Sequence, residues 1–261
     1  MKKLLYLLIL AFIGYHFLFS DSSDFDKTLS LEQISLYQGH LILVNKETKL
    51  QEDPTNLAPI PRDIAANVLV DGDYLLDARA LKSLGNLFEA AQRDGVMHFT
   101  INSAYRSGKL QQQLYEKSGA GFALPSGYSE HQSGLALDIG STQGTMDNTV
   151  EGDWLAQNAH EYGFILRYPE HKTAITRISF EPWHFRYVGL PHSVMMQKKD
   201  FVLEEYLQFL QQEEYYEMKV DEIAYVVQYA QGTTAKVPDT QSLRISGNNK
   251  DGYVITSILE E

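Results

Sequence analysis

The most informative absence in this 261-residue chain is cysteine, which does not occur once. Without thiols the chain can form no disulfide, no cysteine nucleophile, no iron–sulfur cluster and no lipid anchor on cysteine. A metal ion would therefore have to be held by histidine and carboxylate side chains. Basic residues are also scarce: 22 lysines and arginines stand against 34 aspartates and glutamates, for a net charge of −12. This balance argues against a nucleic-acid partner, which needs a basic face on the protein.

Long hydrophobic runs are scarce too, and the one near the N-terminus is short. Lys2 and Lys3 precede an apolar segment over residues 4–19. It is shorter than the roughly 20 residues of a usual membrane span, yet no small-x-small cleavage site follows it. We expect residues 1–20 to be an uncleaved signal anchor, with a cleaved signal peptide and a buried N-terminal helix as alternatives. In the first two cases the rest of the chain lies outside the cytoplasm, joined by an acidic tether over residues 21–34.

Hydrophobic periodicity and turn signals predict a mixture of helices and strands beyond the tether. Apolar residues at helical spacing predict helices over residues 77–93, 107–117 and 151–162, and a last one that starts at residue 192. Short β-rich runs predict strands over residues 41–44, 99–103, 135–139, 164–167 and 177–180. The sequence pattern changes from mixed helix and strand to strand after about residue 212. There, β-rich segments and a hairpin signal over residues 247–252 predict a small β appendage.

Two short segments look like the two halves of one metal site. His131 and Asp138 lie in the first, and Glu181 and His184 lie about forty residues further on. A catalytic zinc usually takes three protein ligands and keeps a fourth position open, and the two histidines with Asp138 would supply the three. Glu181 would then move the proton of the attacking water. Because His131 and Asp138 are seven residues apart, they can converge only if the chain bends between them, which Gly134 permits.

At these residues the sequence resembles the VanY-type D-alanyl-D-alanine carboxypeptidases. These are zinc peptidases of the bacterial cell wall, in a superfamily with lysostaphin-type peptidases and the hedgehog signalling domain. The family pattern Ser-x-His-x-x-Gly-x-Ala-x-Asp, followed later by Glu-x-Trp-His, matches at every fixed position. The resemblance implies one zinc ion, with His131, Asp138 and His184 as ligands and Glu181 as general base.

A third match lies upstream and concerns the substrate. Tyr105 and Arg106 belong to a Tyr-Arg-Ser stretch that is followed by Gln111, and in the family these residues line the cleft. The resemblance implies that Arg106 grips the terminal carboxylate of the peptide, for which a planar guanidinium is well suited. Ser129 is expected to be a further contact. One departure is Arg177, which stands where a small residue such as glycine is expected.

The implied function is removal of the C-terminal D-residue from peptidoglycan stem peptides or their precursors, with a possible link to glycopeptide resistance. Two alternatives stay open at this point. The same metal site could serve an L,D-carboxypeptidase or an endopeptidase that acts on wall peptides. The fold could also be a non-catalytic module that binds cell-wall peptide, although the intact Glu181 argues against this reading.

The expected fold is α+β, with a central, mainly antiparallel sheet that carries the zinc site and is flanked by helices. Residues 35–211 are expected to form the zinc carboxypeptidase domain and residues 212–261 the small β-rich appendage. The N-terminal segment is expected to hold the protein at the extracytoplasmic face of a bacterial membrane, or to release it if cleaved.

Overall fold

A computed structural model of the protein describes residues 25–119 and 121–259. The fold is a mixture of helices and sheets, as expected, and its centre is a five-stranded sheet in the order β3-β5-β6-β8-β7. These strands are β3 (Val68–Leu69), β5 (Phe99–Ser103), β6 (Ala136–Ser141), β8 (His184–Tyr187) and β7 (Phe164–Leu166). Only the edge pair β3–β5 is parallel, so the sheet is mainly antiparallel. A two-stranded sheet of β2 (Leu57–Pro59) and β4 (Leu75–Asp77) lies beside it.

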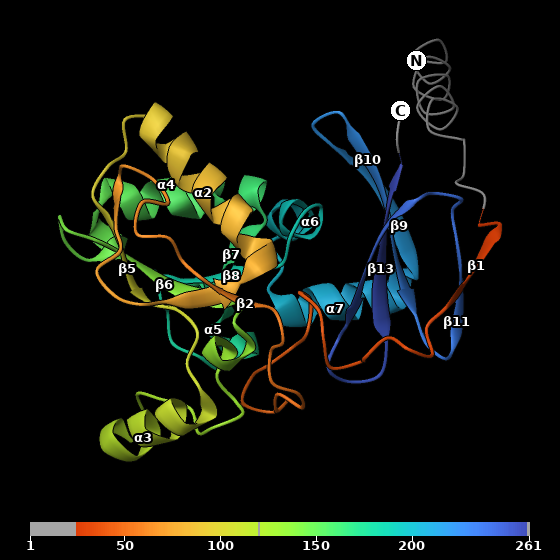
Figure 1. The fold of residues 1–261 in the computed structure, drawn as a ribbon, viewed down its shortest axis with the longest axis horizontal. Helices are drawn as coiled ribbons and strands as arrows, with labels where there is room; N and C mark the ends of the chain where they lie inside the picture. Colours follow the sequence, from red (N-terminus) through yellow and green to blue (C-terminus); the bar gives the residue numbers. More distant parts are fainter. Residues whose placement is uncertain (1–24, 120, 260–261) are drawn as a thin grey trace, which may run out of the picture.

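Helices lie on both sides of the central sheet (Figure 1). On one side are α2 (Ala78–Arg93) and α4 (Val150–Asn158), and on the other are α3 (Gly108–Ser118) and α5 (Thr173–Thr176). Single-turn 3-10 helices are η1 (Glu130–Ser133), η2 (Met146–Asn148), η3 (Ala159–Tyr162) and η4 (Glu170–Lys172).

The start of α2 and the start of α3 illustrate how the sequence sets these boundaries. The Asp77 carboxylate accepts from the Arg79 backbone N–H, and the Ser107 hydroxyl accepts from that of Leu110, so each residue caps its helix. The apolar stripe of α2 is buried against the sheet through Leu84, Leu87 and Phe88 among others. The predicted helices over residues 77–93 and 107–117 are thereby confirmed within one residue at their ends.

Two predicted strands are wrong. Residues 41–44 are buried but irregular, because their backbone groups pair with side chains and a distant turn instead of a neighbouring strand. Ser246 accepts from the Leu41 N–H, and the Arg186 guanidinium donates to the carbonyl of Ile42. Residues 177–180 are irregular as well, since Arg177 adopts a left-handed conformation that ends α5. At residues 41–44 the apolar pattern reflected burial and not sheet pairing, whereas residues 177–180 are exposed or half-buried.

The predicted last helix is two helices, α6 (His192–Lys199) and α7 (Leu203–Glu213). Asp200 ends α6 with a φ of 54°, a left-handed conformation that Asp tolerates better than most residues. Leu203, Tyr206 and Leu210 on α7 are buried in a second core with Val227 and Val254 of the C-terminal strands and with other apolar residues. The C-terminal part therefore packs on α7, in addition to a smaller apolar cluster that includes Val237 and Ile255.

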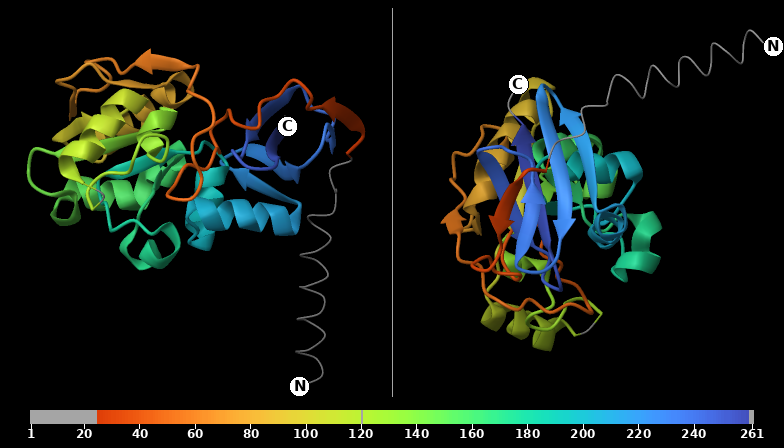
Figure 2. Two further views of the ribbon diagram at one scale, coloured as in Figure 1. Left: turned by 90° about the horizontal axis from the view of Figure 1, so that it is seen from below. Right: turned by 90° about the vertical axis from the view of Figure 1, so that its right-hand side faces the viewer.

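The C-terminal residues form the expected β appendage, an antiparallel sheet in the order β12-β13-β10-β9. Its strands, which Figure 2 shows gathered at one end of the molecule, are β9 (Tyr215–Val220), β10 (Ile223–Ala230), β12 (Ser242–Gly247) and β13 (Tyr253–Leu259). The predicted hairpin joins β12 and β13. A further pair is formed by β1 (Lys27–Ser30) and β11 (Thr234–Val237), so part of the segment predicted as a tether is a strand.

The predicted N-terminal signal segment, residues 1–20, lies outside the described residues. Among the residues that the structure describes, no helix has both the length and the apolar character to cross a membrane.

Candidate active site

The three predicted metal ligands come together at the end of the central sheet. Asp138 on β6 is the direct cross-strand partner of His184, the first residue of β8. His131 reaches them from η1, which ends at Gly134 with a φ of 72°. One ligand atom from each of the three residues lies within 4.8 Å of those of the other two. The predicted bend at Gly134 is therefore the feature that brings His131 beside Asp138.

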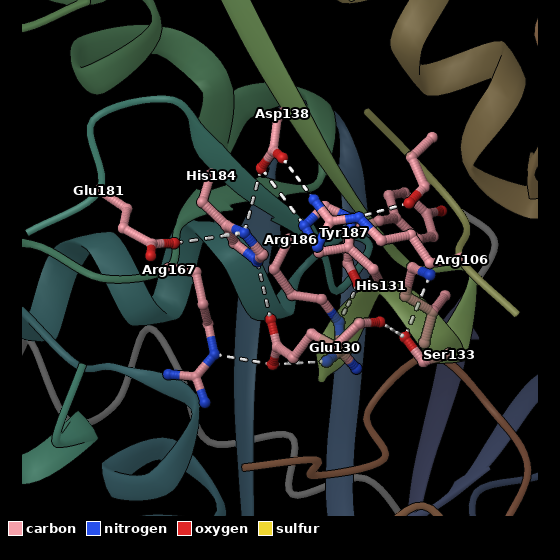
Figure 3. Close-up of polar contacts among 12 residues, drawn as sticks. Arg106, Glu130, His131, Ser133, Asp138, Arg167, Glu181, His184, Arg186 and Tyr187 are labelled. Atoms are coloured by element: carbon pink, nitrogen blue, oxygen red, sulfur yellow. Dashed lines mark hydrogen bonds and ion pairs between the residues drawn. The ribbon is translucent and has the colours of Figure 1, made fainter. Parts of the chain in front are cut away.

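The two imidazoles present different nitrogens to the same point (Figure 3). The Nδ1 of His131 is 2.7 Å from the carbonyl oxygen of Ala104, so Nδ1 carries the proton and Nε2 faces Asp138 at 3.4 Å. His184 is turned the other way: its Nε2 lies 3.4 Å from Glu130 Oε2, and its Nδ1 lies 3.3 Å from Asp138. In each ring an outer acceptor fixes the tautomer that leaves a lone pair on the inner nitrogen.

The two oxygens of the Asp138 carboxylate face different groups. Oδ2 accepts from the Arg106 guanidinium at 3.0 Å. Oδ1 is buried, has no hydrogen-bond partner, and faces the inner nitrogens of His131 and His184. An unpaired buried carboxylate oxygen between two imidazole nitrogens fits a cation, because two nitrogens and one oxygen are a donor set that catalytic zinc uses.

The electrostatic environment also favours positive charge at this point. Burial lowers the pKa of His184, but the carboxylates of Asp138 and Glu130 beside its ring outweigh burial and raise that pKa to about 9. Burial raises the pKa of Asp138, but the two histidines outweigh it and hold the pKa well below its usual value. Asp138 is therefore ionised at neutral pH.

Glu181 lies beside the ligands, as predicted, but outside the tight triad. Its Oε2 is 3.6 Å from His184 Nδ1, and its side chain is 30% exposed, against 13% for Asp138. Burial, together with the neighbouring charges of Asp138 and Glu130, raises the pKa of Glu181 above its ordinary value, while His184 and Arg106 oppose the rise. A carboxylate with a raised pKa next to a metal site is a better proton acceptor than an ordinary surface acid.

The site opens into a cleft of about 280 Å³. Three of the predicted substrate residues, Arg106, Gln111 and Ser129, line it together with the ligands and Glu181. Gln111 is held in place by a hydrogen bond from its Nε2 to the Leu124 carbonyl at 2.7 Å. Tyr105 does not line the cleft, because neighbouring residues of extended chain point in opposite directions and Arg106 takes the inward one.

Arg106 is held on three sides within the protein. Besides Asp138, its Nε donates to Ser103 Oγ at 3.0 Å, and its Nη1 lies 3.5 Å from Gln111 Oε1. Its side chain is 22% exposed towards the cleft. The guanidinium therefore fixes the orientation of Asp138 and still presents charge to the cleft.

Sequence reasoning missed the carboxylate under the site, Glu130. Its side chain is fully buried, and Oε1 accepts from Arg167 Nε and Arg186 Nη1, each at 2.8 Å. Burial raises the pKa of Glu130, but the two guanidinium groups outweigh it and hold that pKa far below its usual value. Arg167 also binds Glu204 of α7 at 2.8 and 2.7 Å. This buried charge cluster fixes the acceptor that faces His184.

The only available signal for Glu130 was its place next to His131 inside the motif. An acidic residue at such a position is usually exposed, and nothing in the sequence pairs it with Arg167 or Arg186. Tyr168 was missed for the same reason: its ring packs against His184 with 4.8 Å between centroids, and it lines the cleft.

Comparisons with known proteins agree with this site. A family model described as VanY, D-alanyl-D-alanine carboxypeptidase, matches residues 73–190. The chain is 43% identical to a D-alanyl-D-alanine carboxypeptidase of Enterococcus faecium, over 88% of this chain and 78% of the relative. It is 37% identical to the bifunctional D-Ala-D-Ala dipeptidase and carboxypeptidase VanXYC of Enterococcus gallinarum, over 66% of this chain and 94% of the relative.

Solved structures extend the likeness to the fold. The vancomycin-resistance D,D-dipeptidase VanXYg, in complex with a D-Ala-D-Ala phosphinate analogue, matches with a TM-score of 0.78 and 34% identity over 89% of this chain and 99% of that one. The LD-carboxypeptidase LdcB matches with a TM-score of 0.56 and 33% identity, over 64% of this chain and 84% of that one. A VanY D,D-pentapeptidase in complex with Zn(II) matches with a TM-score of 0.51 and 32% identity, over 64% of this chain and 98% of that one. The chain belongs to the VanY family of D-alanyl-D-alanine carboxypeptidases.

Proposed function

We propose that the protein is a zinc-dependent carboxypeptidase that removes the C-terminal D-alanine from peptidoglycan stem peptides or their precursors. The observation that carries the proposal is the convergence of His131, Asp138 and His184 beside Glu181, in a cleft that also contains Arg106. The names of the relatives support the substrate class. A link to vancomycin resistance fits the same relatives.

His131 Nε2, Asp138 Oδ1 and His184 Nδ1 are the atoms that would hold the zinc ion. Bound zinc supplies a Lewis acid that polarises a peptide carbonyl and lowers the pKa of water towards neutrality. The task of the protein around it is to keep both rings in the tautomer that binds metal. Ala104 does this for His131, and Glu130 does it for His184.

Glu181 is the residue that moves protons. Among the described residues that line the cleft, Glu181 is the one carboxylate that is neither a proposed zinc ligand nor fully buried. It takes the proton from the attacking water. It then passes that proton to the leaving amine of the terminal D-residue. Its raised pKa suits both steps, because the group must accept a proton and then release it at neutral pH.

Arg106 selects a free C-terminus. The Arg106 side chain is 22% exposed and is fixed by Asp138 and Ser103, so it can bind a carboxylate at little further entropic cost. Gln111 and Ser129 line the same cleft and are proposed as contacts to the peptide. An endopeptidase substrate has no terminal carboxylate for Arg106 to bind.

An L,D-carboxypeptidase is the second candidate, because the LdcB structure shares the fold with this chain at 33% identity. Liquid chromatography with mass detection on defined tri-, tetra- and pentapeptide stems decides between the two. Loss of one D-alanine from the pentapeptide, and no cut in the tetrapeptide, is the expected result. Activity must vanish with a chelator and return with zinc. A protein that shortens only the tetrapeptide would refute the D,D specificity.

The proposed place of action is the outer side of a bacterial membrane, where the wall peptides lie. The proposed catalytic unit spans residues 35–211, with residues 212–261 as its appendage and residues 1–20 as its signal anchor. A membrane-fractionation experiment that compares the full chain with a chain starting at residue 25 tests the anchor.

A further inference from the structure

A turn and a loop meet at the outer rim of the cleft and bring two cations together. Lys46 Nζ donates to the Arg177 carbonyl at 2.7 Å, and Arg177 Nη1 lies 2.6 Å from Glu47 Oε1. All three side chains are exposed. Among the described residues, Lys46 has no carboxylate within ion-pair distance, so the group carries a net positive charge in a chain of net charge −12.

The turn that presents Lys46 is fixed before any ligand arrives. Asn45 Oδ1 accepts from the backbone N–H groups of Glu47 and Thr48, an arrangement that mimics a backbone turn. The amide nitrogen of Asn45 in turn donates to Glu204, the carboxylate that binds Arg167. The rim is thus tied to the buried charge cluster under the catalytic site.

Lys46 and Arg177 line two hollows at once. One is the catalytic cleft, which also contains Arg106, and the other is a hollow of about 470 Å³ that extends to Lys250 in the appendage. Arg106 lines only the first hollow. A peptide whose terminal carboxylate is bound at Arg106 would leave the cleft across the two rim cations, and its upstream residues would enter the second hollow.

We propose that Lys46 and Arg177 form a second anion-binding subsite, which recognises a carboxylate on the peptide upstream of the bond that is cut. The inference rests on the proposed carboxypeptidase function. Stem peptides offer such a group, because their γ-linked glutamyl residue carries either a free carboxylate or a carboxamide. Glu47 holds Arg177 in the absence of peptide, but this ion pair is 63% and 65% exposed and is therefore easily exchanged.

The conformation of Arg177 supports a role for its side chain. The residue has a φ of 59°, where glycine is the least strained choice, and it ends α5 there. An arginine at this position has a conformational cost that glycine would avoid. Arg177→Gly is therefore expected to fold well, which makes it a clean test.

The test uses two pentapeptides that differ only in a carboxylate or a carboxamide on the γ-linked glutamyl residue. We expect the wild-type kcat/KM to favour the carboxylate by about fivefold at low ionic strength, the scale of an exposed ion pair, and the preference to shrink as salt screens it. Arg177→Gly and Lys46→Gln should bring the ratio close to one, and Glu47→Gln should increase it. Arg62→Ala, which removes an exposed ion pair to Asp73 outside both hollows, is the matched control and should keep the wild-type ratio.

Calorimetry of the same two peptides with the zinc-loaded Glu181→Gln protein measures the preference without turnover. Equal affinities for the two peptides, or a ratio that Arg177→Gly leaves unchanged, would overturn the subsite even if both peptides are cleaved. Absence of cleavage of either peptide by the wild-type protein would refute the proposed function, while the binding ratio would still decide on the subsite.

Discussion

His184 directs its Nε2 at the buried Glu130, 3.4 Å away, and so leaves Nδ1 free to face Asp138. Glu130 can hold this position because Arg167 and Arg186 neutralise it in the interior. A carboxylate that accepts from the outer nitrogen of a metal-binding histidine fixes the ring and increases its basicity. The geometry of the metal site therefore depends on a buried charge cluster beneath it.

The first prediction concerns that cluster. Glu130→Gln should lower zinc affinity by about 10- to 100-fold, because the amide is a weaker acceptor for His184. It should also lower stability, by about 3–5 kcal/mol, because two buried guanidinium groups lose their shared partner. Competition with a chromogenic chelator measures the affinity, and urea unfolding measures the stability.

Glu204→Gln is the control for this prediction, since it removes the other carboxylate of Arg167 without contact to His184. It should lower stability and leave zinc affinity close to that of the wild type. If both variants lost zinc equally, the effect would be one of folding, and the positioning role of Glu130 would be refuted.

The second prediction separates proton transfer from metal binding. Glu181→Gln should bind one equivalent of zinc but lose about 10²- to 10⁴-fold in kcat, the usual contribution of a positioned general base. Metal content by atomic absorption and kcat on a pentapeptide stem are the two measurements. Retention of full activity by the zinc-loaded variant would assign the proton transfer to another group.

The third prediction concerns recognition of the substrate terminus. Arg106→Lys should lower kcat/KM for a free C-terminus by about 10- to 100-fold, because an ammonium group cannot bind Asp138 and a substrate carboxylate in the same planar way. The readout is the ratio of kcat/KM for the free acid to that for the C-terminal amide. Arg93→Lys at the exposed end of α2 should keep the wild-type ratio. An unchanged ratio in Arg106→Lys would contradict the assignment.

The fourth prediction concerns the dependence of stability on pH. Burial, aided by the charge of Arg79, lowers the pKa of His40 to about 3 from an ordinary value of 6.5. Below pH 6.5 the unfolded chain therefore binds a proton at His40 that the folded protein does not bind. The contribution of His40 to the free energy of unfolding is thus fully present above pH 6.5 and is lost as the pH falls towards 3. At pH 5 the loss should be about 2 kcal/mol for this one group.

Urea unfolding at pH 7 and pH 5 checks the fourth prediction. The stability of His40→Gln should fall less steeply between the two pH values than that of the wild type. His98→Asn serves as the control, because His98 is exposed and its φ of 76° suits asparagine. An equal loss of stability between pH 7 and pH 5 in the wild type and in His40→Gln would contradict the prediction.

Local signals in the sequence located most of the elements. The capping residues Asp77 and Ser107 and the run from Phe99 to Ser103 act over a few neighbours, so the prediction and the structure agree. The run at residues 41–44 was misread because burial alone does not require a neighbouring strand. The run at residues 177–180 was misread because an apolar pattern does not show the left-handed turn at Arg177. Arg186, far along the chain, supplies the hydrogen bonds that a strand would have given residues 41–44.

The sequence by itself determined the chemistry: which three side chains can bind a metal, which carboxylate is left over, and which family carries this pattern. These features are encoded in short segments whose residue types and spacing are visible without a fold. Only the tertiary structure decided that Tyr105 lies outside the cleft, that Glu130 rests between Arg167 and Arg186, and that Lys46 meets Arg177 at the rim. Each of these is a contact or an orientation fixed by segments distant in the chain, and no local pattern records which distant groups become neighbours.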